Sequence, residues 1–252
     1  MSLPYAARRR TQIRTSIGHS KDDATTIRVD DRAGTREAIF YELRRKGRTV
    51  REASDWHGKP TRHREDDWNY NAIALHHAGN SFSCKEAPVK ALHRVNGIDG
   101  KRFAQMSYHY AIDCHGTIYE ALDIRRKGSH IHDDNTGRIG VVLLADLSTH
   151  GEAAKHGPGV WQVFREEGWR RAFSEWAGIQ KDRFDTIQDT ATESQLESLS
   201  HLVDSLRRVF PIRALGGHRE FALSRDSSRA CPGAHGLIIA QLLRAEFKLD
   251  AP

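Results

Sequence analysis

The sequence predicts an α/β fold in which a single mixed β-sheet is flanked by helices, with a basic extension at the N-terminus. Apolar runs of strand length at 72–75 and 139–147, and a strand–turn–strand pattern at 107–121, indicate the sheet. An apolar stripe at helical spacing, preceded by a capping pattern, indicates a helix over 192–210. Continuous apolar strands need cover on both faces, so we expect helices on both sides of the sheet.

Length and composition are typical of one globular domain with an appendage, or of two domains at most. The chain has 252 residues, of which 38% are hydrophobic and 29% are charged. No apolar run approaches the roughly 20 residues that cross a bilayer, so no membrane insertion is expected. The first ten residues place arginines where a secretory signal needs an apolar segment. We therefore expect synthesis in the cytoplasm without a signal peptide.

The positive charge is concentrated in residues 1–65. This segment has 16 Lys and Arg against 9 Asp and Glu, whereas the rest of the chain has 23 against 24. It includes an arginine cluster at 8–14 and a weakly helical segment, 35–48, with basic residues near its end. One interpretation is an electrostatic arm for an anionic polymer such as cell-wall glycan or nucleic acid. A solvated extension that packs loosely is favoured, because nucleic-acid-binding motifs are missing, and no nucleic-acid partner is expected.

A polar segment at 58–65, which begins Gly-Lys-Pro, marks the boundary between this basic extension and a domain of residues 66–252. Within the domain, the run at 72–75 is predicted to be a short buried strand. Residues 107–121 are predicted to form a hairpin around an Asp-Cys-His-Gly turn. The run at 139–147 suits a strand in the middle of the sheet, and these three pieces make up the expected sheet.

The predicted helices lie in the C-terminal half of the chain. Thr192 to Gln195 match a capping box, and an apolar stripe follows, formed by Leu196, Leu199, Val203, Leu206 and Phe210. Residues 237–247 are predicted to form a closing helix with its Leu, Ile and Phe residues inward. The intervening segment, 149–190, is interpreted as a helical insertion rich in aromatic residues. Their helical spacing favours a packed face over a sugar-stacking one.

The three cysteines do not indicate a disulfide framework. An odd number suits one metal thiolate, Cys231, and two other thiols. Cys84 and Cys114 can pair only if the fold brings them together, and the expected cytoplasmic synthesis disfavours that pairing. The favoured interpretation is that both are small buried apolar residues.

The clearest candidate for chemistry is a metal site. His218 and Cys231 flank a polar loop, and imidazole with thiolate is a ligand pair that suits zinc. A third ligand is predicted from the paired histidines that end the apolar run at 73–77. Because neighbouring side chains of a strand point to opposite faces, only one of the pair can face the metal, and His76 is favoured over His77. Three protein ligands with a fourth position open is the arrangement of a catalytic zinc.

Several motifs in order resemble one protein family. They are LHHAG (75–79), SYHYAIDCHGTIYEA (107–121), GSH (128–130) with RIGVVLLADL (138–147), GHRE (217–220) and ACPG (230–233). Together they resemble the zinc-dependent N-acetylmuramoyl-L-alanine amidases, which include phage lysozyme-type amidases and animal peptidoglycan-recognition proteins. The likeness runs from about Trp68 to about Leu249. It implies a fold of that kind and hydrolysis of the bond between N-acetylmuramic acid and the L-alanine of the stem peptide.

The resemblance also implies roles for individual residues. Tyr108 matches the family's tyrosine, whose phenol can donate to the developing oxyanion or assist proton transfer. Arg229 stands two residues before the thiolate, where the family often has lysine. Its permanent charge can stabilise the tetrahedral intermediate but cannot supply a proton. His130 and His77 are assigned to substrate binding, with a solvent-facing or structural role as the alternative for His77. His109 is predicted to be a buried or supporting group.

Two departures from the family pattern affect these assignments. The spacing from His218 to Cys231 is 13 positions, whereas about eight are expected in the phage and animal branches, so the intervening loop is enlarged. Asp226 within that loop is an alternative ligand to Cys231, though the ACPG context favours the cysteine. Val142 stands where the cytoplasmic recycling branch carries a glutamate, which favours the phage-like branch.

The sequence therefore predicts a zinc peptidoglycan amidase. The alternative is a non-catalytic peptidoglycan-binding module, but such modules commonly lack the metal cysteine that is present here. The expected partners are peptidoglycan and muropeptides. The expected site of action is the cell wall or periplasm, reached by non-classical export or injection, as for a phage-type lysin or an injected antibacterial toxin. A toxin would also require an immunity protein in the producing cell.

Overall fold

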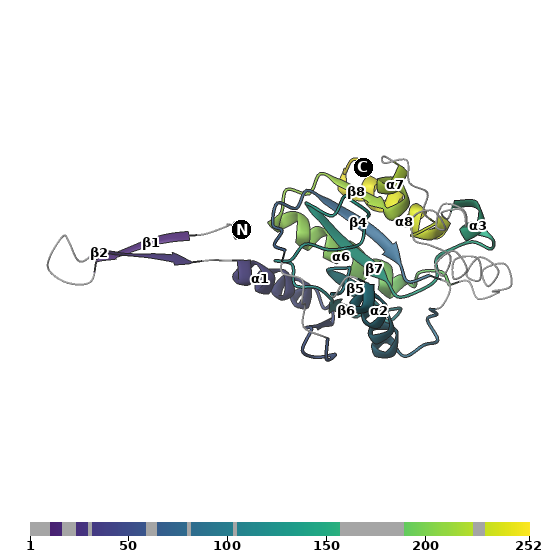
Figure 1. Cartoon of the computed structure of the whole chain (residues 1–252), viewed down its shortest axis with the longest axis horizontal. Helices are drawn as coiled ribbons and strands as arrows, with labels where there is room; N and C mark the ends of the chain where they lie inside the picture. Colours follow the sequence, from purple (N-terminus) through teal and green to yellow (C-terminus); the bar gives the residue numbers. More distant parts are fainter. Residues whose placement is uncertain are drawn as a thin grey trace.

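The computed structural model contains one six-stranded mixed sheet with helices on both faces (Figure 1). The structure describes residues 11–16, 24–29, 32–58, 65–79, 82–102, 105–156, 189–223 and 230–252. The sheet strands are β3 (Val50–Arg51), β4 (Ala72–His77), β5 (Tyr110–Ile112), β6 (Ile118–Glu120), β7 (Arg138–Leu143) and β8 (Ala214–Gly217). The helices are α1 (Arg32–Arg45), α2 (Pro88–Arg102), α3 (Glu152–His156), α6 (Glu193–Val209), α7 (His218–Leu223) and α8 (Gly233–Phe247). The predicted fold class is confirmed.

The strands follow the order β3-β6-β5-β7-β4-β8. Only β5 and β6 pair in antiparallel fashion, as the predicted hairpin, and the remaining neighbours are parallel. The three predicted pieces supply β4 to β7. The prediction missed β3, which has only two residues, and β8, whose Ala-Leu-Gly-Gly sequence lacks the β-branched residues that mark strands. Because β4, β5, β7 and β8 run parallel, their carboxyl ends meet at one edge of the sheet.

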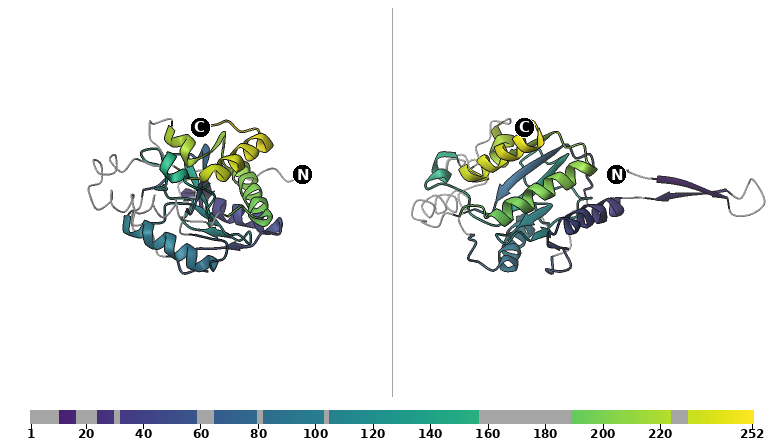
Figure 2. Two further views of the ribbon diagram at one scale, coloured as in Figure 1. Left: turned by 90° about the vertical axis from the view of Figure 1, so that its right-hand side faces the viewer. Right: turned by 180° about the vertical axis from the view of Figure 1, so that it is seen from behind.

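Two layers of helices cover the sheet (Figure 2). Helices α1, α6 and α8 share one core with the strands, and α2 packs with a second cluster on the opposite face. Side chains alternate between these layers along each strand, as in Val141 and Val142 of β7, which belong to the first and second cluster respectively. This two-sided burial explains the near-continuous apolar character of β7.

Helix α6 begins as the sequence predicts. The Thr192 hydroxyl accepts a hydrogen bond from the Gln195 backbone N–H at 3.1 Å, which caps the helix. The Gln195 side chain does not return the bond to Thr192 but donates to the Ile112 carbonyl of β5 at 2.9 Å. In the predicted stripe, Leu196 is 37% exposed and Leu202 is buried in its place. The cap was therefore predicted correctly, and the stripe is rotated by part of a turn.

The predicted boundary at residue 65 divides a continuous core. Ile39, Phe40 and Leu43 of α1 are fully buried in the same core as α6 and α8, and β3 pairs with β6. The basic end of α1 is also engaged, because Arg44 forms an ion pair with Glu52 and Lys46 forms one with Asp204 on α6. Residues 32–58 thus belong to the globular body and are not part of a loosely packed extension.

Ahead of α1, the chain forms a hairpin that the sequence did not predict. Strand β1 (Thr11–Ser16) pairs in antiparallel fashion with β2 (Ala24–Val29), and this ribbon projects from the body beyond α1 (Figure 1). Residues 8–10 of the arginine cluster lie outside the described residues. Among the helices that the structure describes, none has the length and apolar character to cross a membrane.

The predicted insertion at 149–190 is described only at its two ends. Helix α3 occupies its first part, and Asp189 follows at its end. The aromatic residues on which its interpretation depends, Trp161 to Trp176, lie outside the described residues.

Cys84 and Cys114 form a disulfide, which corrects the prediction that they are separate buried thiols. Their Cα atoms are 5.5 Å apart although 30 positions separate them in sequence. Cys84 lies ahead of α2, and Cys114 lies in the turn between β5 and β6. The two segments meet because α2 covers the face of the sheet next to that turn. Sequence spacing alone carries no sign of this proximity.

Candidate metal centre

Strand β4 presents His76 to the face of the sheet opposite the larger core. Ile73 and Leu75 point into the core shared with α1, α6 and α8, whereas Ala72 and Ala74 belong to a small cluster on the other face. His76 follows Ala74 by two positions and therefore lies on that second face, fully buried. The predicted choice of His76 over its neighbour agrees with this geometry.

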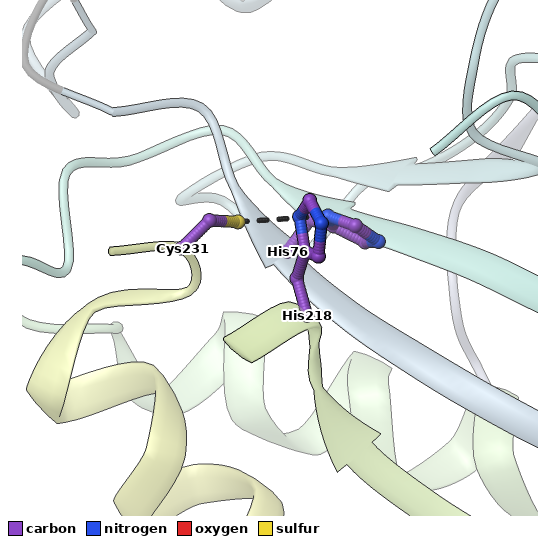
Figure 3. Close-up of side chains that lie close together, drawn as sticks. All are labelled: His76, His218 and Cys231. Atoms are coloured by element: carbon purple, nitrogen blue, oxygen red, sulfur yellow. Dashed lines mark hydrogen bonds between the residues drawn. The ribbon is translucent and has the colours of Figure 1, made fainter. Parts of the chain in front are cut away.

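The two other candidate ligands come from the C-terminal part of the chain. His218 opens α7 directly after β8, which pairs in parallel with β4 so that Gly217 lies opposite Leu75. Cys231 stands just ahead of α8 and is not part of the disulfide. Figure 3 shows the three side chains directed toward one another from these separate elements. Both His218 and Cys231 are partly exposed, so the cluster reaches the surface.

The donor atoms have separations that suit a tetrahedral zinc site. Ligand atoms of His76, His218 and Cys231 all lie within 4.8 Å of one another. The Cys231 Sγ is 3.5 Å from the His76 Nδ1 (Figure 3). Zinc bonds of ordinary length to nitrogen and sulfur at a tetrahedral angle would separate the two atoms by about 3.6 Å. One thiolate with two imidazoles is also a donor set that zinc prefers, so these residues fit the metal.

The protonation of His76 also favours a metal. Burial, and next the neighbouring His218 and His130, hold the pKa of His76 well below its usual range. The ring is therefore neutral at pH 7, which is the form that binds a cation. Its Nδ1 faces Cys231, and its Nε2 is 3.1 Å from the Nδ1 of His130. With Nδ1 on a metal, the Nε2–H would donate to His130, which fixes the tautomer and the ring orientation.

His130 lies behind His76 and not in an exposed groove, which corrects its assignment to substrate binding. It is 6% exposed, and burial followed by the neighbouring His109 and His218 holds its pKa well below the usual range. Its ring packs on Gly140 of β7, where a Cβ atom would come within 2.6 Å of the ring. Glycine at 140 is thus required for His130 to support His76.

A third buried histidine continues this row. The Gly140 N–H donates to the His109 Nδ1 at 3.0 Å, so the proton of the neutral ring is on Nε2, which donates to the Arg126 carbonyl at 2.9 Å. Burial lowers the pKa of His109 to about 4. The prediction that His109 is a buried group and not a ligand agrees with this arrangement.

Tyr108 lies beside the candidate ligands. Its ring centroid is 4.8 Å from that of His76 with the planes tilted by 59°, and the residue is partly exposed. The side chain therefore sits where it can reach both the cluster and a molecule bound at the surface. This placement is consistent with its predicted catalytic role.

His77 has a structural role, which corrects its assignment to substrate binding. The side chain points to the opposite face from His76, is 8% exposed, and accepts a hydrogen bond from the Leu147 N–H at 3.1 Å. Its solvent-facing alternative is wrong as well. Arg229 and Asp226, the predicted charge stabiliser and the alternative ligand, both lie outside the described residues.

Glu220, whose role the sequence left open, supports the β8–α7 junction. Its carboxylate accepts a hydrogen bond from the Gly217 N–H at 2.8 Å and pairs with Arg244 of α8 at 2.9 Å. Arg244 also donates to the Leu215 carbonyl at 3.1 Å. Glu220 therefore orients the start of α7, from which His218 projects.

Comparison with known proteins agrees with this geometry. Residues 66–234 match the family described as N-acetylmuramoyl-L-alanine amidase, a span that contains all three candidate ligands. The chain belongs to this family. Peptidoglycan-recognition protein SC2 of Drosophila melanogaster is 29% identical over 108 residues, which are 41% of this chain and 59% of that protein. The present chain therefore matches less than two thirds of the length of that relative.

Solved structures of similar proteins share the fold of this amidase-family chain. One is the ectodomain complex of peptidoglycan recognition proteins LCa and LCx with tracheal cytotoxin, at a TM-score of 0.53 and 17% identity, covering 76% of this chain and 93% of that one. Another is the endolysin N-acetylmuramoyl-L-alanine amidase LysCS from Clostridium intestinale, at a TM-score of 0.51 and 16% identity. The match covers 80% of this chain and 97% of the chain of LysCS. At these identities the two structures show that the chain shares their fold.

Proposed function

We propose that the chain is a zinc-dependent peptidoglycan hydrolase that cleaves the amide bond between N-acetylmuramic acid and the L-alanine of the stem peptide. The observation that carries this proposal is the convergence of His76, His218 and Cys231 at the surface end of β4. Three protein ligands that leave a fourth position open are typical of catalytic zinc, whereas structural zinc has four. Membership of the amidase family supports the same activity.

Each residue of the centre has a part in this proposal. Bound zinc would supply a Lewis acid and a water of lowered pKa, which the hydrolysis of an unactivated amide requires. His76, His218 and Cys231 would hold the ion, and His130 would orient His76. The Tyr108 phenol would donate a hydrogen bond to the carbonyl oxygen as negative charge develops there. Arg229, two residues before Cys231 in the sequence, would supply a permanent positive charge that stabilises the tetrahedral intermediate.

The alternative activity is binding without hydrolysis. The structural neighbour with tracheal cytotoxin shows that a protein of this fold binds a ligand of that kind, which supports a muropeptide ligand for this chain. The complete set of two imidazoles and one thiolate favours hydrolysis, because binding a muropeptide does not require a metal nucleophile site.

The decisive test is cleavage of purified muropeptides, followed by mass spectrometry and zinc analysis. We expect about one zinc per chain and products separated at the lactyl–alanine amide, and we expect Cys231→Ser to lose zinc and at least 100-fold of the rate. Cys84→Ser is the matched control, because that sulfur lies outside the ligand set. Cleavage that persists in fully metal-free protein would contradict the mechanism. Tight muropeptide binding without cleavage by zinc-loaded protein would favour the binding module.

The proposed target places the active protein at the cell wall or in the periplasm, delivered as a phage-type lysin or as an injected antibacterial toxin. The Cys84–Cys114 disulfide supports a site outside the reducing cytoplasm. An injected toxin would also require an immunity protein in the producing cell, and one that covers the zinc centre would be sufficient.

Production in two compartments tests the target. Directing the chain to the periplasm of a Gram-negative host should lyse the cells, whereas cytoplasmic production at the same level should be tolerated. Periplasmic Cys231→Ser, at matched abundance, should be harmless. Equal toxicity from the cytoplasm would argue against the wall as the target.

A further inference from the structure

Cys231 depends on tertiary contacts for its position. Thirteen positions separate it from His218, and a connection of that length leaves the relative placement of its two ends largely free. We infer that the buried ion pair between Glu152 and Arg219 is the device that positions the Cys231 thiolate for the metal. The inference rests on the proposed zinc centre. Neither side chain is proposed to touch substrate or metal, so both are positioning residues.

Arg219 bonds the cysteine segment to α7 from two sides. Its backbone N–H donates to the carbonyl of Cys231 itself at 2.8 Å. Its guanidinium donates to the carbonyl of Ala230 at 2.5 Å and pairs with Glu152. Arg219 directly follows His218. These bonds therefore connect the segment that carries Cys231 to the residue next to His218.

Glu152 completes the frame from the other side. One carboxylate oxygen pairs with Arg219, and the other accepts hydrogen bonds from the N–H groups of Ala234 at 2.9 Å and Thr149 at 2.8 Å. A single carboxylate thereby joins the segment after β7, the first turn of α8 and α7. Cys231 lies between the two attachment points, Ala230 and Ala234.

The segment that carries Cys231 also packs closely against Leu147, in the stretch that follows β7. Gly233 has φ of +80°, and a Cβ atom there would come within 2.3 Å of the Leu147 carbonyl oxygen. The His235 N–H donates to that oxygen at 3.2 Å. This close approach leaves the segment little room to shift while Arg219 and Glu152 remain paired.

The burial of the pair makes its removal consequential. Glu152 is 3% exposed and Arg219 is 8% exposed, so removing either charge breaks a buried ion pair and leaves the charge of the other residue buried without this partner. A rearrangement that brings water to the remaining charge would have to move the Cys231 segment, since the pair is bonded to it on both sides. The expected result is a displaced thiolate in a chain whose sheet and larger core remain intact.

The test uses the full chain with Arg219→Gln and Glu152→Gln. Zinc affinity is measured by competition with a chromophoric chelator, and the thiolate-to-metal absorption band is measured after loading with Co²⁺. We expect each variant to bind zinc 10- to 100-fold more weakly and to show a reduced thiolate band, as for the loss of residues that orient metal ligands. Arg219→Lys should retain part of the affinity, because its ammonium can still pair with Glu152.

Arg36→Gln is the matched control. Arg36 of α1 forms an ion pair with Glu120 of β6, which is 4% exposed. In the sheet order, β5 and β7 separate β6 from β4, the strand that carries His76. This variant should lower the unfolding temperature without changing zinc affinity or the cobalt band. If Arg219→Gln and Glu152→Gln behave like Arg36→Gln, the positioning role is wrong.

The outcomes separate this inference from the proposed function. Wild-type protein that binds no zinc would overturn the zinc centre and the positioning role together. Wild-type zinc binding with unaltered variants would overturn the positioning role alone. Should Arg219→Gln fail to fold, Glu152→Gln, which keeps the shape of the side chain, decides the question.

Discussion

Two cysteine sites lie along the same edge of the sheet, and the fold holds each of them in a different way. Cys114 lies just beyond the carboxyl end of β5 and is joined covalently to Cys84. Cys231 lies near the carboxyl ends of β4 and β8 and is held by hydrogen bonds around Arg219. The first site needs only rigidity, so its sulfur atoms can be consumed in a bond. In the proposed zinc centre the second must keep its thiolate available for the metal, so the surrounding backbone is fixed instead.

The disulfide site also anchors neighbouring elements. The Thr192 hydroxyl that caps α6 donates to the Cys114 carbonyl at 2.6 Å, and the Cys84 N–H donates to Asp189 at 3.0 Å. The turn of the hairpin, the approach to α2 and the start of α6 are thus tied at one point. Loss of the cross-link should therefore lower global stability and leave the candidate metal ligands in place.

Removing the disulfide is the strongest test of this division. We expect Cys84→Ala with Cys114→Ala to lower the free energy of unfolding by about 3–4 kcal/mol, because the bond closes a loop of 30 positions in the unfolded chain. Zinc affinity should remain within a factor of two. Denaturant unfolding and chelator competition give the two numbers. A loss of zinc affinity comparable to that of Cys231→Ser would show that the two sites are not independent.

Acidification should lower the free energy of unfolding by a somewhat smaller amount, through a buried histidine that lies outside the disulfide site. The pKa of His109 is about 4 in the folded protein, below its ordinary value, so the unfolded chain binds that proton first as the pH falls. Stability should therefore decrease below about pH 6.5, by up to roughly 3 kcal/mol at pH 4 and below from this residue. Unfolding of metal-free protein at several pH values measures the slope.

The control for the acid effect is His109→Gln. An amide can accept from the Gly140 N–H and donate to the Arg126 carbonyl, as the neutral ring does, but it does not titrate. The variant should lose less stability than the wild type between pH 6.5 and 4, while the disulfide variant should keep the wild-type slope. Identical slopes for wild type and His109→Gln would contradict the role of the buried ring.

Much of the fold could be predicted because it is written in local patterns. Strand alternation limited the candidate ligand to one of His76 and His77, the Asp-Gly turn located the hairpin, and Thr192 marked the start of α6. Strand β8 escaped notice because two of its four residues are glycine, although it delivers His218 to the site. A strand of that composition is recognised only by the partner beside it.

Other errors came from contacts between distant segments. The basic character of residues 1–65 suggested an extension, yet α1 is buried through Ile39, Phe40 and Leu43 while its charged residues face outward and pair. His130 was assigned to substrate binding from the family resemblance of its GSH segment, which says nothing of where the side chain points in this fold. Only its contact with His76 reveals that it supports the ligand.

By itself, the sequence determined the fold class, the family and the identity of the three candidate ligands, because each depends on residue type and short-range spacing. The tertiary structure alone decided the disulfide, the direction of His130 and the frame of Glu152 and Arg219 around Cys231. The disulfide, the contact of His130 with His76 and the ion pair of Glu152 with Arg219 join residues 30, 54 and 67 positions apart. Such contacts form only when the packed sheet and helices bring their ends together, so no local pattern records them.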